Sequence, residues 1–169
     1  NGALEFSNAN GEPKRIRIQR VHLEEDTGRS IHDPVSKTTL LDFNRAGIPL
    51  MELVTEPDLR DAADARIAAQ HIQRIFQYVN ASEANMEKGE MRIEANVSIR
   101  PVGTDALGTK VELKNINSFR FVEDAITYEV SRQAELLERG EKVIQETRGW
   151  DAGEGVTVNQ RLKEESQDY

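Results

Sequence analysis

LLDFNRAGIPLMEL, residues 40–53, is the stretch around which the rest of the chain is interpreted. Apolar residues occupy both sets of alternating positions between Ile48 and Val54, which predicts a β-strand covered on both faces. Glu52 falls on the same face as Leu50, where a charge is costly unless a cation or hydrogen-bond donors meet it. Two interpretations follow: a structural glutamate neutralised by one arginine, or a functional carboxylate.

Composition narrows the class of protein. The 169 residues are enough for one domain with a buried core, and we expect a single domain over 1–169. The net charge of −8 argues against a broad phosphate-binding surface, and the lack of cysteine excludes disulfides and thiolate metal sites. No apolar run approaches the roughly 20 residues of a membrane span, and no signal peptide is visible. Because the chain starts with Asn1 and not Met, we expect a fragment truncated at both ends.

A cluster of acids follows the first long strand. Apolar positions are even up to Ile18 and odd from Val21, which predicts a β-bulge near Gln19. The next residues, HLEED (22–26), could supply ligands to a hard cation such as Mg²⁺. A solvated strand end is the more common explanation of such a run. Residues 27–39 are predicted to form a loop because their apolar content is low.

The remaining elements alternate between helix and strand patterns. Helical spacing predicts a helix that ends near Val79, capped by Asp58 or Asp61, and a second one over about 119–139. Strands are predicted over 90–100 and 110–114, joined by a loop, and a hairpin over 143–150 and 156–162. Arg148 and Arg161 fall in this hairpin, where surface pairing is the default. The fold class is therefore α+β: a mostly antiparallel sheet with the two long helices on one face and a concave polar face forming the site.

Polar residues of the two central strands are expected to share one surface. If these strands pair antiparallel with their apolar sides on the core, the polar surface carries Glu94, Asn96, Ser98, Lys110, Glu112 and Lys114. Open solvent accounts for most surfaces of this kind. The segment NINS (115–118) favours a binding role, because it leads into a helix N-terminus that can accept a phosphate or carboxylate.

Several motifs together carry a resemblance to a known family. They are VHLEEDTG (21–28), LDFNRAGIPLMEL (41–53), MRIEANVSIRP (91–101), KVELKNINSFRFVE (110–123) and QETRGWD (145–151). In this order they resemble the B subunit of the aspartyl/glutamyl-tRNA amidotransferase, which would make the chain the central part of its catalytic cradle domain. The resemblance implies a ligase that uses ATP and Mg²⁺ to phosphorylate the side-chain carboxylate of Glu or Asp misacylated onto tRNA. Ammonia from glutamine then displaces the phosphate.

The resemblance also implies site residues. Glu25 and Glu52 resemble magnesium ligands, with Glu24 and Asp26 as alternates, and Glu112 would be a further metal or water-orienting group. By position, the ATP and acyl-end pocket would be lined by Asn96, Ser98, Lys114, Asn115 and Asn117. A histidine of the family's metal site belongs to a segment absent from this sequence, so we expect the isolated fragment to be inactive.

The family further implies partners and a compartment. These are the acceptor end of misacylated tRNA, a glutaminase A subunit and a small C subunit, in the bacterial cytoplasm or an organellar matrix and away from membranes. Most of the tRNA-binding surface would lie in a C-terminal tail outside this sequence. Two other functions remain open: a non-catalytic docking module of the complex, and a carboxylate-phosphorylating enzyme with a small-molecule substrate. The sequence leaves the choice between Glu-tRNA and Asp-tRNA open.

Overall fold

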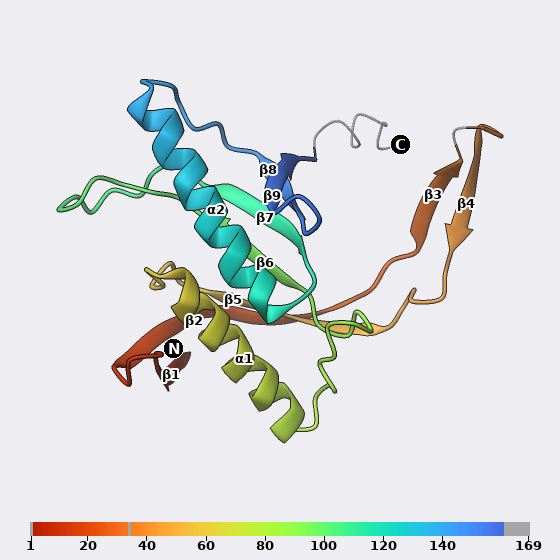
Figure 1. Ribbon diagram of the computed structural model, residues 1–169. Helices are drawn as coiled ribbons and strands as arrows, with labels where there is room; N and C mark the ends of the chain where they lie inside the picture. Colours follow the sequence, from red (N-terminus) through yellow and green to blue (C-terminus); the bar gives the residue numbers. More distant parts are fainter. Residues whose placement is uncertain (1, 34, 161–169) are drawn as a thin grey trace. The chain divides into compact units, whose positions relative to one another are not determined.

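The computed structural model describes residues 2–33 and 35–160 and has an α+β fold, as predicted (Figure 1). Its helices are α1 (Ala62–Tyr78) and α2 (Phe119–Glu138). Its strands are β1 (Gly2–Ser7), β2 (Pro13–Glu25), β3 (Arg29–Asp33), β4 (Thr38–Asp42), β5 (Pro49–Thr55), β6 (Ile93–Val97), β7 (Val111–Ile116), β8 (Thr147–Asp151) and β9 (Val156–Asn159). Neither α1 nor α2 is long and apolar enough to cross a membrane.

The chain divides into two compact units. Unit 1 comprises Asn1–Glu5 and Pro13–Asp58, and unit 2 comprises Phe6–Glu12 and Leu59–Tyr169. The strands form three separate sheets, with the orders β1-β2-β5, β3-β4 and β6-β7-β8-β9. The first two sheets lie mainly in unit 1, whereas the third sheet and both helices belong to unit 2.

Unit 1 is built around the long antiparallel ribbon of β2 and β5. Its register shifts between Ile18 and Arg20, which confirms the predicted bulge. The Arg17 guanidinium donates from Nε to Asp58 Oδ2 at 2.9 Å and from Nη2 to Asp58 Oδ1 at 2.6 Å. Asp58 therefore secures the end of the ribbon, and the residue that caps α1 is Asp61, whose side chain accepts from two backbone N–H groups.

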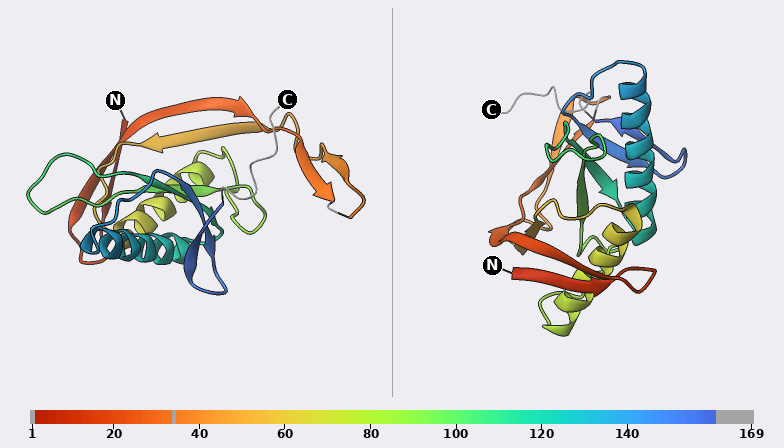
Figure 2. Two further views of the ribbon diagram at one scale, coloured as in Figure 1. Left: turned by 90° about the horizontal axis from the view of Figure 1, so that it is seen from above. Right: turned by 90° about the vertical axis from the view of Figure 1, so that its left-hand side faces the viewer.

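Two predictions for unit 1 are wrong. Much of the loop predicted over 27–39 instead belongs to a hairpin, since β3 (Arg29–Asp33) pairs with β4 (Thr38–Asp42) beyond the end of the β2–β5 ribbon (Figure 2). The pairing uses backbone groups while nearly all its side chains stay exposed, so no apolar alternation marks it in the sequence. The β5 strand is also not covered on both faces, because Met51 is 38% exposed and the Glu52 side chain 45%.

Unit 2 is a four-stranded sheet with α2 against one face (Figure 1). Strands β6 and β7 are antiparallel, as predicted, and so are β8 and β9, whereas β7 and β8 are parallel and are connected through α2. The first helix packs against α2 and less against the sheet itself. Between the sheet and α2 lies the core of Val97, Val111, Leu113, Ile116, Val122, Ala125 and Trp150.

Candidate functional site

In unit 1, a histidine bridges two carboxylates on one face of the β2–β5 ribbon. His22 lies directly opposite Glu52 in the ladder, and its Nδ1 is 3.3 Å from Glu52 Oε2. The other ring nitrogen, Nε2, is 3.4 Å from Glu24 Oε2. The bulge brings Arg20 to the same face, where Nη2 donates to Glu52 Oε2 at 3.0 Å. Glu24, His22, Glu52 and Arg20 together are called the acidic cluster below.

The acidic cluster is open to solvent. The side chains of His22, Glu24 and Glu52 are each nearly half exposed, so incoming ligands can reach them. In the described ranges 2–33 and 35–160, no three His, Asp or Glu side chains form a ready-made metal centre. Mg²⁺ in enzymes usually takes one or two carboxylates and completes its shell with water and substrate phosphate. Glu52 or Glu24 could supply one such carboxylate, whereas the imidazole of His22 separates the two from each other.

Two other acids of the HLEED segment, Glu25 and Asp26, do not belong to the acidic cluster. Glu25 pairs with Pro49 in the ladder, and because side chains alternate along a strand it lies on the opposite face from Glu52. Asp26 accepts from Arg45 Nε at 2.8 Å, and its backbone C=O accepts from Gly47 N–H. Of the three predicted acids, Glu24 alone lies on the face of Glu52, with His22 between them, while Asp26 helps to hold the turn that precedes β5.

In unit 2, the predicted residues Asn96, Glu112 and Lys114 lie on the sheet face opposite α2. Asn96, Glu112 and Thr147 are direct neighbours on β6, β7 and β8. Thr147 Oγ1 donates to Glu112 Oε2 at 2.9 Å. Lys114 Nζ lies 3.5 Å from Glu94 Oε1 and 3.9 Å from Glu112 Oε2. The antiparallel register confirms that polar residues of β6 and β7 share one surface, and it carries acceptors, donors and a cation.

The segment after β7 has a partly structural role. Asn115 adopts a positive φ of 61°, a conformation that asparagine tolerates better than most residues. Its Nδ2 donates to the Trp150 backbone C=O at 2.9 Å, and its Oδ1 accepts from Asn117 Nδ2 at 3.3 Å. The Ser118 hydroxyl caps α2 by accepting from Phe121 N–H. Asn117 is exposed, and Ser98 directly follows β6.

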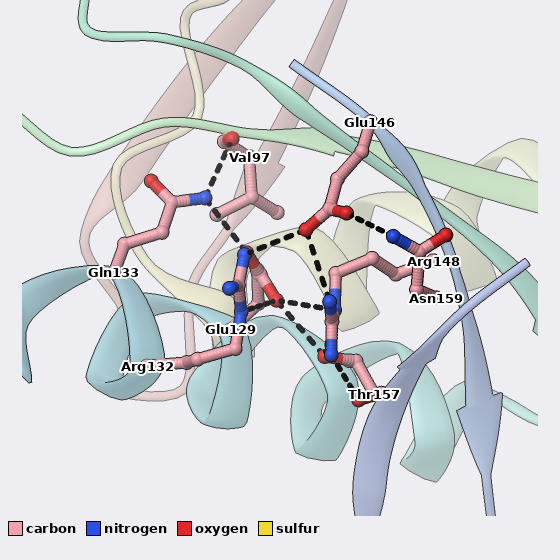
Figure 3. A network of polar contacts seen from close by, with 8 residues as sticks. All are labelled: Val97, Glu129, Arg132, Gln133, Glu146, Arg148, Thr157 and Asn159. Carbon is pink, nitrogen blue, oxygen red and sulfur yellow. Dashed lines mark hydrogen bonds and ion pairs between the residues drawn. The ribbon is translucent and has the colours of Figure 1, made fainter. Parts of the chain in front are cut away.

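A buried charge network lies on the other face of this sheet (Figure 3). Glu129 on α2 is fully buried and accepts from Arg132 Nε at 2.9 Å, Gln133 Nε2 at 2.9 Å and Thr157 Oγ1 at 3.0 Å. Arg148 donates from Nε to Thr157 Oγ1 at 2.8 Å and from Nη1 to Glu146 Oε1 at 2.9 Å. Glu129, Arg132, Glu146 and Arg148 are called the buried network below.

The sequence did not predict the buried network. Surface pairing of Arg148 is wrong, because its side chain is only 15% exposed and points to the α2 side of the sheet (Figure 3). Arg161 lies outside the described residues. One signal was present: Glu129 stands four residues after Ala125 and four before Gln133, within the inward stripe of α2.

The environment of Glu129 predicts a specific pH dependence. Burial raises its pKa, but the hydrogen bonds from Arg132, Gln133 and Thr157 and the charge of Arg132 lower it further, so the pKa lies below the ordinary value. A depressed folded-state pKa contributes stability above the unfolded-state pKa, and this stability is lost as pH falls through the folded-state value. We expect the difference in unfolding free energy between the wild type and Glu129→Gln to shrink as pH falls below about 4.5, as measured by urea titration. A constant difference would contradict this prediction.

Comparison with known proteins identifies the family. The family model of the GatB/GatE catalytic domain matches residues 1–169. The B subunit of the aspartyl/glutamyl-tRNA(Asn/Gln) amidotransferase of Thermodesulfovibrio yellowstonii is 52% identical over 160 residues, which cover 95% of this chain and 34% of that protein. The B subunit of the Halorhodospira halophila enzyme is 51% identical over 168 residues, covering 99% and 35%. The chain spans about a third of the length of these relatives. With its whole length matched in this way, the chain belongs to the GatB/GatE catalytic-domain family.

Proposed function

We propose that this chain is the catalytic core of an amidotransferase B subunit, which phosphorylates the side-chain carboxylate of Glu or Asp misacylated onto tRNA before amide formation. Its family and the names of its relatives support an amidotransferase. The observation that carries the proposal is the acidic cluster, in which Glu24 and Glu52 flank His22 on one solvent-accessible face.

The chemistry gives these residues a role. A carboxylate is a poor acyl donor, and transfer of the γ-phosphoryl group of ATP to its oxygen creates a good leaving group. Bound Mg²⁺ would neutralise charge on the phosphates. Glu52 would hold the ion with Glu24 or Glu25, and the register favours Glu24 because it shares the face of Glu52. Arg20 holds Glu52 in place through its 3.0 Å contact.

The polar surface of unit 2 would serve the reacting ends of the substrates. Lys114 supplies a cation suited to phosphate, and Glu112 could orient a nucleophile or a metal-bound water. Asn96, Ser98, Asn115 and Asn117 would complete the pocket for ATP and the acyl end. Ammonia then attacks the acyl carbon, phosphate leaves, and Gln- or Asn-tRNA is formed.

Partners follow from the same proposal. Ammonia would come from glutamine through a glutaminase A subunit, with a small C subunit completing the complex, in the bacterial cytoplasm or an organellar matrix. With a net charge of −8, this chain would meet only the acceptor end of the tRNA, while other parts of the full protein bind the rest.

A docking module is the second candidate. Unit 1 exposes several large apolar side chains, and exposed apolar surface is often used in protein interfaces. They are Val21, Leu23, Leu40, Leu41 and Phe43. In this alternative the chain would contribute binding surface to the complex and no chemistry.

One experiment separates the two candidates. Glu24→Gln, Glu25→Gln and Glu52→Gln are made in the full-length protein, and tRNA-dependent ATP hydrolysis is measured in the assembled complex. We expect Glu52→Gln to lower the rate by on the order of 100-fold, because loss of a charged ligand weakens metal binding. Mn²⁺ affinity, measured by electron paramagnetic resonance, should fall in parallel.

Glu24 and Glu25 are a matched pair, because they are adjacent acids on opposite faces of one strand. A loss confined to Glu24→Gln would assign the second carboxylate to Glu24, and a loss confined to Glu25→Gln would assign it to Glu25. Wild-type rates in all three variants would remove the catalytic proposal and favour the docking module.

A further inference from the structure

The proposed catalytic carboxylate of unit 2 is held by a residue outside the predicted site. Thr147 opens β8 and lies directly beside Glu112 in the parallel ladder. Its hydroxyl donates to Glu112 Oε2 at 2.9 Å, the same oxygen that lies 3.9 Å from Lys114 Nζ. Among the described residues no group bonds Glu112 Oε1, which leaves that oxygen for a substrate or water.

The backbone of β8 is secured on both of its edges. On one edge, Glu112 N–H donates to the Glu146 C=O at 3.0 Å. This backbone bond holds β7 and β8 together immediately next to the contact between Glu112 and Thr147. On the other edge, Gln160 N–H donates to the Thr147 C=O at 3.2 Å. The backbone of Thr147 is therefore held in place, which fixes the position from which its hydroxyl bonds Glu112.

The buried network holds the same segment from the opposite face of the sheet (Figure 3). The Glu146 carboxylate accepts from Arg148 Nη1 at 2.9 Å and from Asn159 Nδ2 at 2.5 Å. It also lies 3.5 Å from Arg132 Nη2, and both arginines approach Glu129 on α2. The side chains of Glu146 and Arg148 therefore anchor this segment to α2 on one face of the sheet, while Thr147 points to the polar surface on the other face.

We propose that Thr147 is a positioning residue that sets the direction of the Glu112 carboxylate. A partly exposed glutamate has several rotamers of similar energy, and Lys114 attracts it from one side. A hydrogen bond from a hydroxyl on a rigid strand selects one rotamer and keeps Oε1 available. This inference rests on the role proposed above for Glu112.

Thr147→Val tests the inference because it removes the hydroxyl and keeps the β-branched shape. In the full-length protein within its complex, we expect kcat of tRNA-dependent ATP hydrolysis to fall about tenfold with KM for ATP changed less than about twofold, since a misdirected carboxylate slows the reacting step. Thr147→Ser retains the donor and should restore kcat to within about twofold of the wild type. The control is Thr104→Val, whose hydroxyl donates to the Pro101 C=O in a loop.

A double-mutant cycle with Glu112→Gln separates positioning from general destabilisation. If Thr147 acts through Glu112, Thr147→Val adds no further loss in the Glu112→Gln background. A full additional loss in that background, or a normal kcat in Thr147→Val alone, would overturn the positioning role while leaving Glu112 in the proposed function. A normal kcat in Glu112→Gln would remove the proposed role of Glu112 and the inference with it.

Discussion

Glu129→Gln is expected to lower the free energy of unfolding by about 3–5 kcal/mol, the usual cost of removing one member of a buried ion pair. Glu129 is fully buried and accepts hydrogen bonds from Arg132, Gln133 and Thr157. Without its negative charge, Arg132 and Arg148 keep only Glu146 as an anionic partner in the network. Two guanidinium groups with little access to water would then share one carboxylate, which is why the effect should be large.

Urea denaturation followed by tryptophan fluorescence measures this loss. The chain has one tryptophan, Trp150, which lies in the core of unit 2 and reports its unfolding directly. The matched control is Glu135→Gln, the same substitution at an exposed position of α2. We expect the control to change stability by less than about 0.5 kcal/mol. Equal small effects in both variants would show that the buried network contributes little to stability.

Leu113→Ala should destabilise unit 2 by about 2–5 kcal/mol, the range for deleting a buried leucine side chain. Leu113 has no exposed surface and lies on β7, which is flanked by strands on both sides and covered by α2. The cavity would be enclosed by well-paired strands that cannot close around it easily, so part of the cost comes from lost packing contacts.

The control for this cavity is Leu137→Ala, which removes the same atoms from a half-exposed position near the end of α2. Urea titrations of both variants should give a clearly smaller change for Leu137→Ala, because little apolar surface returns to water there. Similar losses for the two leucines would mean that β7 is not the centre of the core.

Periodic patterns predicted the regular elements well. The helical stripe placed the second helix at about 119–139, close to α2, and the alternation from Glu90 to Arg100 located β6, although only Ile93–Val97 is paired as a strand. These patterns work because each element buries one face. The hairpin of β3 and β4 buries neither face, so its sequence carries no such pattern.

The arrangement of side chains was harder to predict, because it depends on partners far away in the chain. Glu129 falls within the inward stripe of α2, but its partners Thr157, 28 residues later, and Arg148 come from strands, and no local pattern connects them to it. The pairing of Glu52 with His22, and hence with Glu24, required the register of two strands that are about 30 residues apart. The family resemblance predicted Glu25 and Glu52 as joint ligands, with Glu24 and Asp26 as alternates, whereas the ladder places Glu24 on the face of Glu52 and Glu25 on the opposite face.

The shift between Ile18 and Arg20 determines which side of the ribbon each later residue of β2 occupies. Removing one residue there would move every later side chain of β2 to the opposite face of the ribbon. Val21 and Leu23 would then exchange faces with His22 and Glu24. The orientation of these acids thus depends on the length of the chain at one point, several residues before them. Insertions and deletions at this position should be tolerated far less than changes of residue type.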